Sequence, residues 1–134
     1  MSVYALDSNI ISFYLRENAS VIENIEKAIS NGNVIVIPPI VYYEVKRGLM
    51  FINATKKIKE FEALCELFPV GDLDNYLLEK SVNIYLQERS AGRNTEDADI
   101  FIAAFCIHNN YILVTDNIKH FSNITDLRTI NWAR

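Results

Sequence analysis

Short runs of apolar, largely β-branched residues constrain the fold of this chain more than any other feature of its sequence. The clearest run is Val34-Ile35-Val36-Ile37, which is apolar at every position and is followed by Pro38-Pro39. A strand without polar alternation is typical of a parallel sheet that is covered on both faces. Two runs of similar character, residues 3–6 and 111–115, lie near the two ends of the chain. They predict a buried sheet whose strands are far apart in the sequence.

Segments with helical spacing separate these strands. In residues 20–31 the apolar positions recur at helical intervals, and Ser20 is a plausible N-cap. The other expected helices are residues 39–51, 54–67, 72–90 and 97–109, and two weaker runs, 68–70 and 127–130, are candidate short strands. This alternation predicts one α/β domain over residues 1–134, with a mostly parallel sheet of about four to five strands and helices on both faces.

Charge and composition narrow the functional classes. The formal net charge is −4, so binding of nucleic acid through overall positive charge is not expected, although an acidic cluster that holds metal ions can attract phosphate locally. Residues 100–107 form the longest apolar run, far below the ~20 residues that span a bilayer, and no signal peptide is recognisable. Cys65 and Cys106 lie among apolar residues, as buried thiols in a reducing compartment do. We expect a cytoplasmic protein without a membrane partner.

Two acidic residues directly follow predicted strands. Asp7 comes after residues 3–6, and Asp116 comes after residues 111–115. The carboxyl ends of parallel strands share one edge of the sheet, where α/β proteins build their ligand sites. Aspartate is also common in turns and at N-caps, so each position taken alone allows a purely structural role.

A third acid, Glu44, lies in or beside the apolar stripe of the helix expected over residues 39–51. Its helical neighbours include Ile40, Val41 and Gly48. A carboxylate in such surroundings has to be paired, hydrogen-bonded or bound to a cation. A mid-helix glycine costs about 1 kcal/mol relative to alanine, and it is tolerated where another backbone or a ligand comes close. A buried salt bridge or an exposed edge position is the structural alternative for Glu44.

A fourth acid, Asp99, lies in the first turn of the helix expected over residues 97–109. The helix dipole favours acids there, which accounts for Glu96 and Asp97. It accounts less well for Asp99, because apolar residues 100–104 follow it. We therefore expect a functional role for Asp99.

Carboxylates that converge on one point repel each other unless they are protonated or bind a cation. Oxygen ligands of this kind favour Mg²⁺ or Mn²⁺. Such a site can activate water and stabilise the charge that develops on a phosphate. The predicted topology permits the four acids to converge, but no spacing within the sequence requires it.

Four motifs, taken in order, resemble the PIN-domain family, and among its members they are most similar to the VapC-type toxins of toxin–antitoxin modules. The motifs are Leu6-Asp7-Ser8-Asn9, Glu44-Val45-Lys46-Arg47-Gly48-Leu49, Asp99-Ile100-Phe101-Ile102-Ala103-Ala104, and Leu113-Val114-Thr115-Asp116-Asn117 with Phe121. With the terminal Asn131-Trp132 the resemblance covers nearly the whole chain. It implies a PIN-like three-layer α/β/α domain and an endoribonuclease that uses Mg²⁺ or Mn²⁺.

The resemblance also implies roles for individual residues. Many members of the family carry the fourth acid two residues after the threonine, where this chain has Asn117, whereas Asp116 comes only one residue after Thr115. Which of the two fills the fourth position, and whether one or two metals bind, stays open. The expected catalytic and metal-binding residues are Asp7, Glu44, Asp99 and Asp116, with Asn9, Thr115 and Asn117 in support.

The family further implies RNA as the substrate, a homodimer, and a cognate antitoxin that holds the toxin inactive. Lys46 and Arg47 flank Glu44 and are the expected phosphate contacts, with a solvated helix face as the alternative. Large apolar residues on the helices can pack in the core or across an interface, and core packing is expected for most of Tyr42, Tyr43, Phe51 and Phe61. His108 and His120 have no ligand-like spacing and are expected to be structural.

A catalytically inert PIN-like module is the main alternative to a nuclease. It would use the acidic pocket to dock an arginine of a partner protein, and the displaced acid Asp116 favours it. A phospho-signalling domain is disfavoured because the strand over residues 34–37 ends in two prolines without an acid. A haloacid-dehalogenase-type phosphatase is disfavoured because Asn9 stands where its second aspartate belongs.

Overall fold

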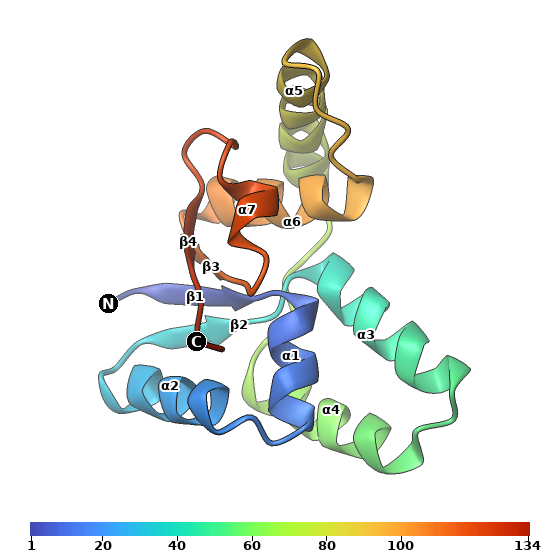
Figure 1. Ribbon diagram of the computed structural model, residues 1–134, viewed down its shortest axis with the longest axis vertical. Helices are drawn as coiled ribbons and strands as arrows, with labels where there is room; N and C mark the ends of the chain where they lie inside the picture. The colour runs from blue at the N-terminus through green and yellow to red at the C-terminus, as the bar shows by residue number, and fades with distance from the viewer.

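The computed structural model describes all 134 residues and contains one sheet of four strands in the order β2-β1-β3-β4 (Figure 1). Its strands are β1 (Val3–Leu6), β2 (Val34–Val36), β3 (Ile112–Val114) and β4 (Arg128–Ile130). Every pair is parallel, and Ala5 of β1 is in register with Val36 on one side and Leu113 on the other. The predicted α/β class is confirmed, with a wholly rather than mostly parallel sheet.

Seven helices connect and cover the strands. They are α1 (Ser8–Leu15), α2 (Ala19–Ser30), α3 (Pro39–Phe51), α4 (Thr55–Leu67), α5 (Asn75–Ser90), α6 (Asp97–Asn109) and α7 (Ile118–Phe121). In Figure 1, α5 and α6 lie on one side of the sheet and α2 and α4 on the other. The sheet is therefore the middle layer of an α/β/α arrangement, as the resemblance implies.

The centre of the sheet anchors the loops that follow β1 and β3. Leu6, Leu113 and Val114 have no exposed surface, and they belong to a cluster of 28 buried hydrophobic residues. Full burial of each such side chain contributes about 1.5–3 kcal/mol. Because both faces of these strands are covered, their sequences show no polar alternation. The residues that come next, Asp7 and Thr115, are thereby held at one rigid edge.

Some expected element boundaries are wrong. The N-cap of α2 is Asn18, which accepts from the amide of Val21, whereas the Ser20 hydroxyl donates to the carbonyl of Trp132. Residues 68–70 form only an isolated parallel bridge, between Val70 and Ile37. The helix expected over 72–90 begins at Asn75, because Asp74 caps it, and the short helix α7 was not expected.

Two of the large aromatic residues expected in the core are on the surface. Phe61 is fully buried and Tyr42 is half-buried against it, but Tyr43 is 55% exposed and Phe51 is 88% exposed. Both cysteines are free thiols, and burial raises the pKa of each. None of the helices is long and apolar enough to cross a membrane.

Candidate functional site

Asp7 is the best-buried acid of the expected set. It follows β1 and caps α1, and only 4% of its surface is exposed. Its Oδ1 accepts from the Ser8 amide at 2.8 Å, and its Oδ2 accepts from the Thr115 hydroxyl at 2.7 Å. Burial raises the pKa of Asp7, and these two hydrogen bonds oppose that rise. The carboxylate is therefore fixed in orientation but poorly solvated.

Polar residues after β3 tie that loop to the start of α1. The Thr115 oxygen accepts from the Asn117 amide at 3.0 Å while its hydroxyl donates to Asp7. Asn9 bridges the two segments, because its Oδ1 accepts from the Asp116 amide at 3.1 Å and its Nδ2 lies 3.4 Å from Asp7 Oδ2. The predicted supporting residues thus form one network around the Asp7 carboxylate.

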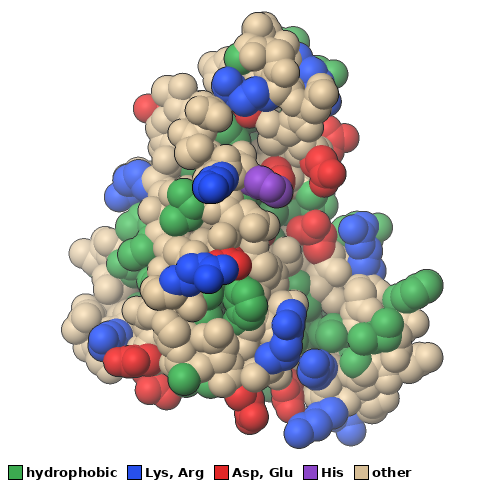
Figure 2. All heavy atoms as spheres, in the orientation of Figure 1, with side chains coloured by type: hydrophobic (Ala, Val, Ile, Leu, Met, Phe, Trp, Pro, Cys, Tyr) green, Lys and Arg blue, Asp and Glu red, His purple; other side chains and the backbone are tan.

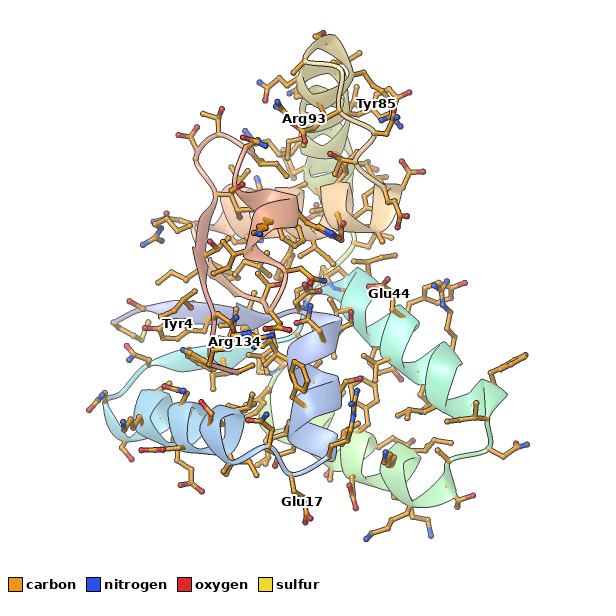
Figure 3. The ribbon with its side chains drawn as sticks, viewed as in Figure 1. Tyr4, Glu17, Glu44, Tyr85, Arg93 and Arg134 are labelled. Carbon is orange, nitrogen blue, oxygen red and sulfur yellow. The ribbon has the colours of Figure 1, made fainter.

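Glu44 reaches the same edge from α3, on the part of that helix nearest the sheet (Figure 3). Its Oε1 is buried and has no hydrogen-bond partner. Burial raises the pKa of Glu44, the charge of Asp7 raises it further, and Arg47 opposes the rise. A buried oxygen without a donor is costly, so Glu44 Oε1 is the atom at this edge that most clearly needs a further partner, such as a cation.

Asp99 approaches from the first turn of α6. Burial raises its pKa, and the charge of Asp7 adds to that rise. The imidazole of His120, on α7, lies 3.7 Å from Asp99 Oδ2 through its Nδ1 and opposes the rise. Figure 2 shows acidic side chains gathered beside a histidine on this face, between α5 and α3. His120 was expected to be only structural, but its ring lies beside Asp99 at the candidate site.

The chemistry of these three acids fits a divalent cation. Asp7 raises the pKa of both Glu44 and Asp99, so the three share one electrostatic environment. No three acidic, histidine or cysteine side chains lie close enough to hold an ion as they stand. A shared ion therefore requires a side-chain rotation or bridging water, which Mg²⁺ commonly retains. The orphaned Glu44 Oε1 is the atom that gains most from such a ligand.

Comparison with known proteins identifies the family. The family model described as the PIN domain matches residues 4–127. The chain belongs to the PIN-domain family.

This PIN domain is similar to curated proteins and to solved structures over nearly its whole length. It is 28% identical to "Ribonuclease VapC1" of Haemophilus influenzae (strain R2866) and to "Ribonuclease VapC2" of Rickettsia felis, and each match covers 98% of this chain and 99% of the relative. The structure of VapBC2 from Rickettsia felis bound to a promoter DNA fragment contains a chain with a TM-score of 0.90 at 25% identity, covering 97% of this chain and 98% of that one.

A cleft of about 430 Å³ borders Glu44 in this PIN domain. Its lining includes Asn9, Arg47, Gly48 and Asn117. A Cβ built on Gly48 would meet no atom within 4 Å, so of the two expected reasons for this glycine the close approach of another backbone does not apply, and Gly48 lines the open cleft. Space beside Glu44 is thus available to a substrate or partner.

The carboxylate of Asp116 is engaged outside this cleft. Its Oδ1 accepts from Asn131 Nδ2 at 2.9 Å and from Arg134 Nε at 3.1 Å, and Arg134 is labelled in Figure 3. These contacts, the Asn131 hydrogen bond first, lower the pKa of Asp116. Asp116 therefore already has partners for its negative charge, whereas Asn117 lines the cleft beside Glu44.

Lys46 and Arg47, the two basic residues that follow Glu44 on α3, have different neighbours. Lys46 Nζ pairs with Glu62 of α4 at 3.1 Å and lies over the Tyr42 ring. Arg47 lines the cleft and stacks on Tyr43, with its guanidinium carbon 4.8 Å from the ring centroid. Only Arg47 is placed where it can meet a ligand of Glu44.

Proposed function

We propose that this PIN domain is a divalent-metal-dependent endoribonuclease that acts as the toxin of a toxin–antitoxin pair. The observation that carries the proposal is the unpartnered, buried Glu44 Oε1 beside two further acids whose pKa values are raised. The relatives named as ribonucleases over nearly the full chain support the same reaction class.

In this proposal Asp7, Glu44 and Asp99 hold Mg²⁺ or Mn²⁺. A bound ion supplies an activated water and neutralises charge on the phosphate under attack. Ser8 and Thr115 orient the Asp7 carboxylate, since they donate to its two oxygens. Asn9 keeps the loops after β1 and β3 in register.

We assign the fourth position of the site to Asn117 rather than Asp116. Asn117 lines the cleft that holds Glu44, while Asp116 Oδ1 is bound by Asn131 and Arg134. Arg47, at the same cleft, is the proposed phosphate contact. The displaced acid that favoured an inert binding module is accounted for by these contacts, so that alternative is not favoured.

An antitoxin protein and a second copy of this chain are the proposed partners. Similar structures are described as VapBC2 from Rickettsia felis and VapBC-1 from nontypeable Haemophilus influenzae, and such VapBC structures are toxin–antitoxin complexes. Two groups of exposed apolar side chains are candidate surfaces for these partners. They are Met50, Phe51 and Ile52 at the end of α3, and Leu78, Val82, Tyr85 and Leu86 on α5.

The direct test is inducible expression in a bacterial host beside Asp7→Asn, with growth and RNA integrity followed over time. Asp126→Asn is a matched control, because Asp126 is exposed and asparagine tolerates its positive φ of 69°. We expect growth arrest with discrete RNA fragments from the parent and from Asp126→Asn, and neither from Asp7→Asn. Intact RNA with all three proteins soluble would contradict the proposal.

A further inference from the structure

A second cavity, of about 340 Å³, opens on the Asp99 side of the site. Its lining residues, none of them hydrophobic, are Asn94, Thr95, Glu96, Asp99 and His120. Its volume falls at the small end of the range for small-ligand pockets, roughly 300–1,000 Å³. It shares Asp99 with the candidate metal centre, so a ligand in it lies next to the reacting phosphate of the proposed reaction.

Residues 93–96 form a loop along the wall of this cavity. Glu88 of α5, which is only 2% exposed, holds this loop in place by hydrogen bonds. Glu88 Oε2 accepts from Arg93 at 2.7 Å (Nη2) and 3.0 Å (Nε), and its Oε1 accepts from the Thr95 hydroxyl at 2.6 Å. Figure 3 shows Arg93 in the loop beside α5. Both oxygens of one buried carboxylate thus fix residues 93 and 95, on either side of Asn94.

The polar groups of this loop are oriented. Arg89 Nη1 donates to the Arg93 carbonyl at 2.8 Å and to Asn94 Oδ1 at 3.3 Å. The Asn94 amide oxygen is therefore occupied, and its Nδ2, which has no partner within the chain, remains as a donor. Glu96 precedes α6 but makes no side-chain capping bond, so its exposed carboxylate remains as an acceptor.

We propose that this cavity binds and reads one nucleobase of the RNA, beside the scissile phosphate, and that it selects a base with an exocyclic amino group. The inference rests on the proposed ribonuclease function. Glu96 accepts from the amino group, and Asn94 Nδ2 donates to a ring nitrogen or carbonyl on the same edge of the base. Side chains read unstacked RNA bases along such edges.

The charge of the cavity explains why it takes a base and not a phosphate. Glu96, which lines it, is not among the acids assigned to the metal ion, and a free carboxylate repels a phosphate but accepts from an amino group. The His120 side chain is 63% exposed, and its ring offers a face on which a base can stack. Uracil lacks an amino group, so it leaves the Glu96 carboxylate without a donor and is disfavoured.

The test maps cleavage positions in a pool of RNA with randomised sequence. The proteins compared are the parent, Glu96→Gln, Asn94→Ala and the control Asn31→Ala. Asn31 is exposed and precedes β2, so it lies at the opposite edge of the sheet from the site. For the parent and the control we expect uridine to be depleted at one position adjacent to the cut. Glu96→Gln is expected to reduce that depletion about tenfold, and Asn94→Ala to reduce it less.

Glu88 is a positioning residue in this account, and Glu88→Gln tests it separately. Glu88 does not line the cavity. Glu88→Gln is nevertheless expected to reduce the depletion of uridine, as Glu96→Gln does, and to raise KM more than it lowers kcat.

Each outcome of the mapping experiment is decisive. If the parent cuts RNA without a base preference next to the cut, or if Glu96→Gln keeps the parent's preference, the cavity does not read the base and the ribonuclease function stands. If the parent cuts no RNA while the Asp7→Asn comparison also shows no effect, the proposed function fails, and this inference fails with it.

Discussion

Carboxylates lie in poorly solvated surroundings in two regions of this molecule. In one region the carboxylate has a cationic partner within the chain, and in the other the carboxylates have no lysine or arginine partner. Glu88 has a partner for each oxygen, from Arg93 and Thr95, and the Arg93 hydrogen bond holds its pKa below the usual range. No lysine or arginine is paired with Asp7, Glu44 or Asp99. Burial raises the pKa of all three, and the charge of Asp7 raises the pKa of Glu44 and of Asp99 further. The chain neutralises the first group itself and leaves the second for an added cation.

This difference separates an acid that holds the fold from acids that serve a site. A carboxylate paired within the chain stabilises the folded state when it is ionised, whereas an unpaired buried carboxylate destabilises it. Active sites commonly carry such destabilising groups, because activity requires them. Substitutions that remove the charge are therefore expected to have opposite consequences in the two regions.

The largest expected effect is the loss of cleavage on removal of one acid of the site. Asp99→Asn removes a charge from the proposed metal centre while keeping the shape of the side chain. We expect RNA cleavage by the purified protein to fall by about a thousandfold or more, because metal catalysis supplies several kcal/mol. The circular dichroism spectrum and melting transition should be retained. Cleavage at the parental rate would overturn the catalytic assignment.

The next effect is a loss of stability at Glu88. Glu88→Gln leaves Arg93 without its counter-ion, and breaking a buried pair is strongly destabilising. Because Arg93 is partly exposed, with 37% of its side chain accessible, we expect a loss of about 2 kcal/mol in the free energy of unfolding. The pKa of Glu88 is lowered in the fold, so its contribution is present above its unfolded pKa and is lost as pH falls through its folded pKa. Urea unfolding of the parent and of Glu88→Gln at several pH values measures the loss in the free energy of unfolding and its dependence on pH.

The same substitution at Glu44 is expected to act in the opposite direction. Glu44→Gln removes an ionised group that has an unpartnered oxygen, so the metal-free variant should be more stable than the parent by about 1 kcal/mol at neutral pH. The folded pKa of Glu44 is raised, so ionised Glu44 weakens the fold at pH above that value, and the penalty fades as pH falls through it. The stability difference should therefore disappear in acid. A Glu44→Gln protein less stable than the parent at neutral pH would show that Glu44 is a structural acid like Glu88.

The smallest effect on catalysis is expected at Asp116. Its Oδ1 already binds Asn131 and Arg134, so Asp116→Asn should reduce RNA cleavage by less than about tenfold, roughly 1.4 kcal/mol. Asn117→Ala, measured in the same assay, should reduce it more. The reverse order would restore Asp116 to the fourth position of the site.

The sequence predicts those features that depend on local pattern. The apolar runs over residues 3–6 and 111–115 predict Asp7 and Asp116 at one edge of the sheet, and the apolar stripe around Glu44 marks it as an acid that needs a partner. Helical spacing could also have revealed Glu88, because Leu77, Ser81, Ile84 and Glu88 recur at intervals of four, three and four and are the buried face of α5.

Features that depend on contacts across the fold are not readable from the sequence. Asp116 meets Asn131 and Arg134 only because β4 brings the carboxyl terminus back beside β3. His120 meets Asp99 because the four-residue helix α7, too short to show periodicity, packs against α6. Lys46 and Arg47 are neighbours in sequence, but successive residues of a helix point in different directions. Lys46 therefore meets Glu62, whereas Arg47 lines the cleft beside Glu44.

A calorimetric titration of Mn²⁺ into the metal-free protein at neutral pH tests most directly whether the unpaired acids form a cation site. The parent and Asp116→Asn are expected to show saturable binding with similar affinity, and Asp99→Asn and Glu44→Gln should bind much more weakly. Binding to the parent should also weaken as pH falls, because protons compete for carboxylates whose pKa values are raised. Absence of saturable binding to the parent, or equal affinity in Asp99→Asn, would contradict the account.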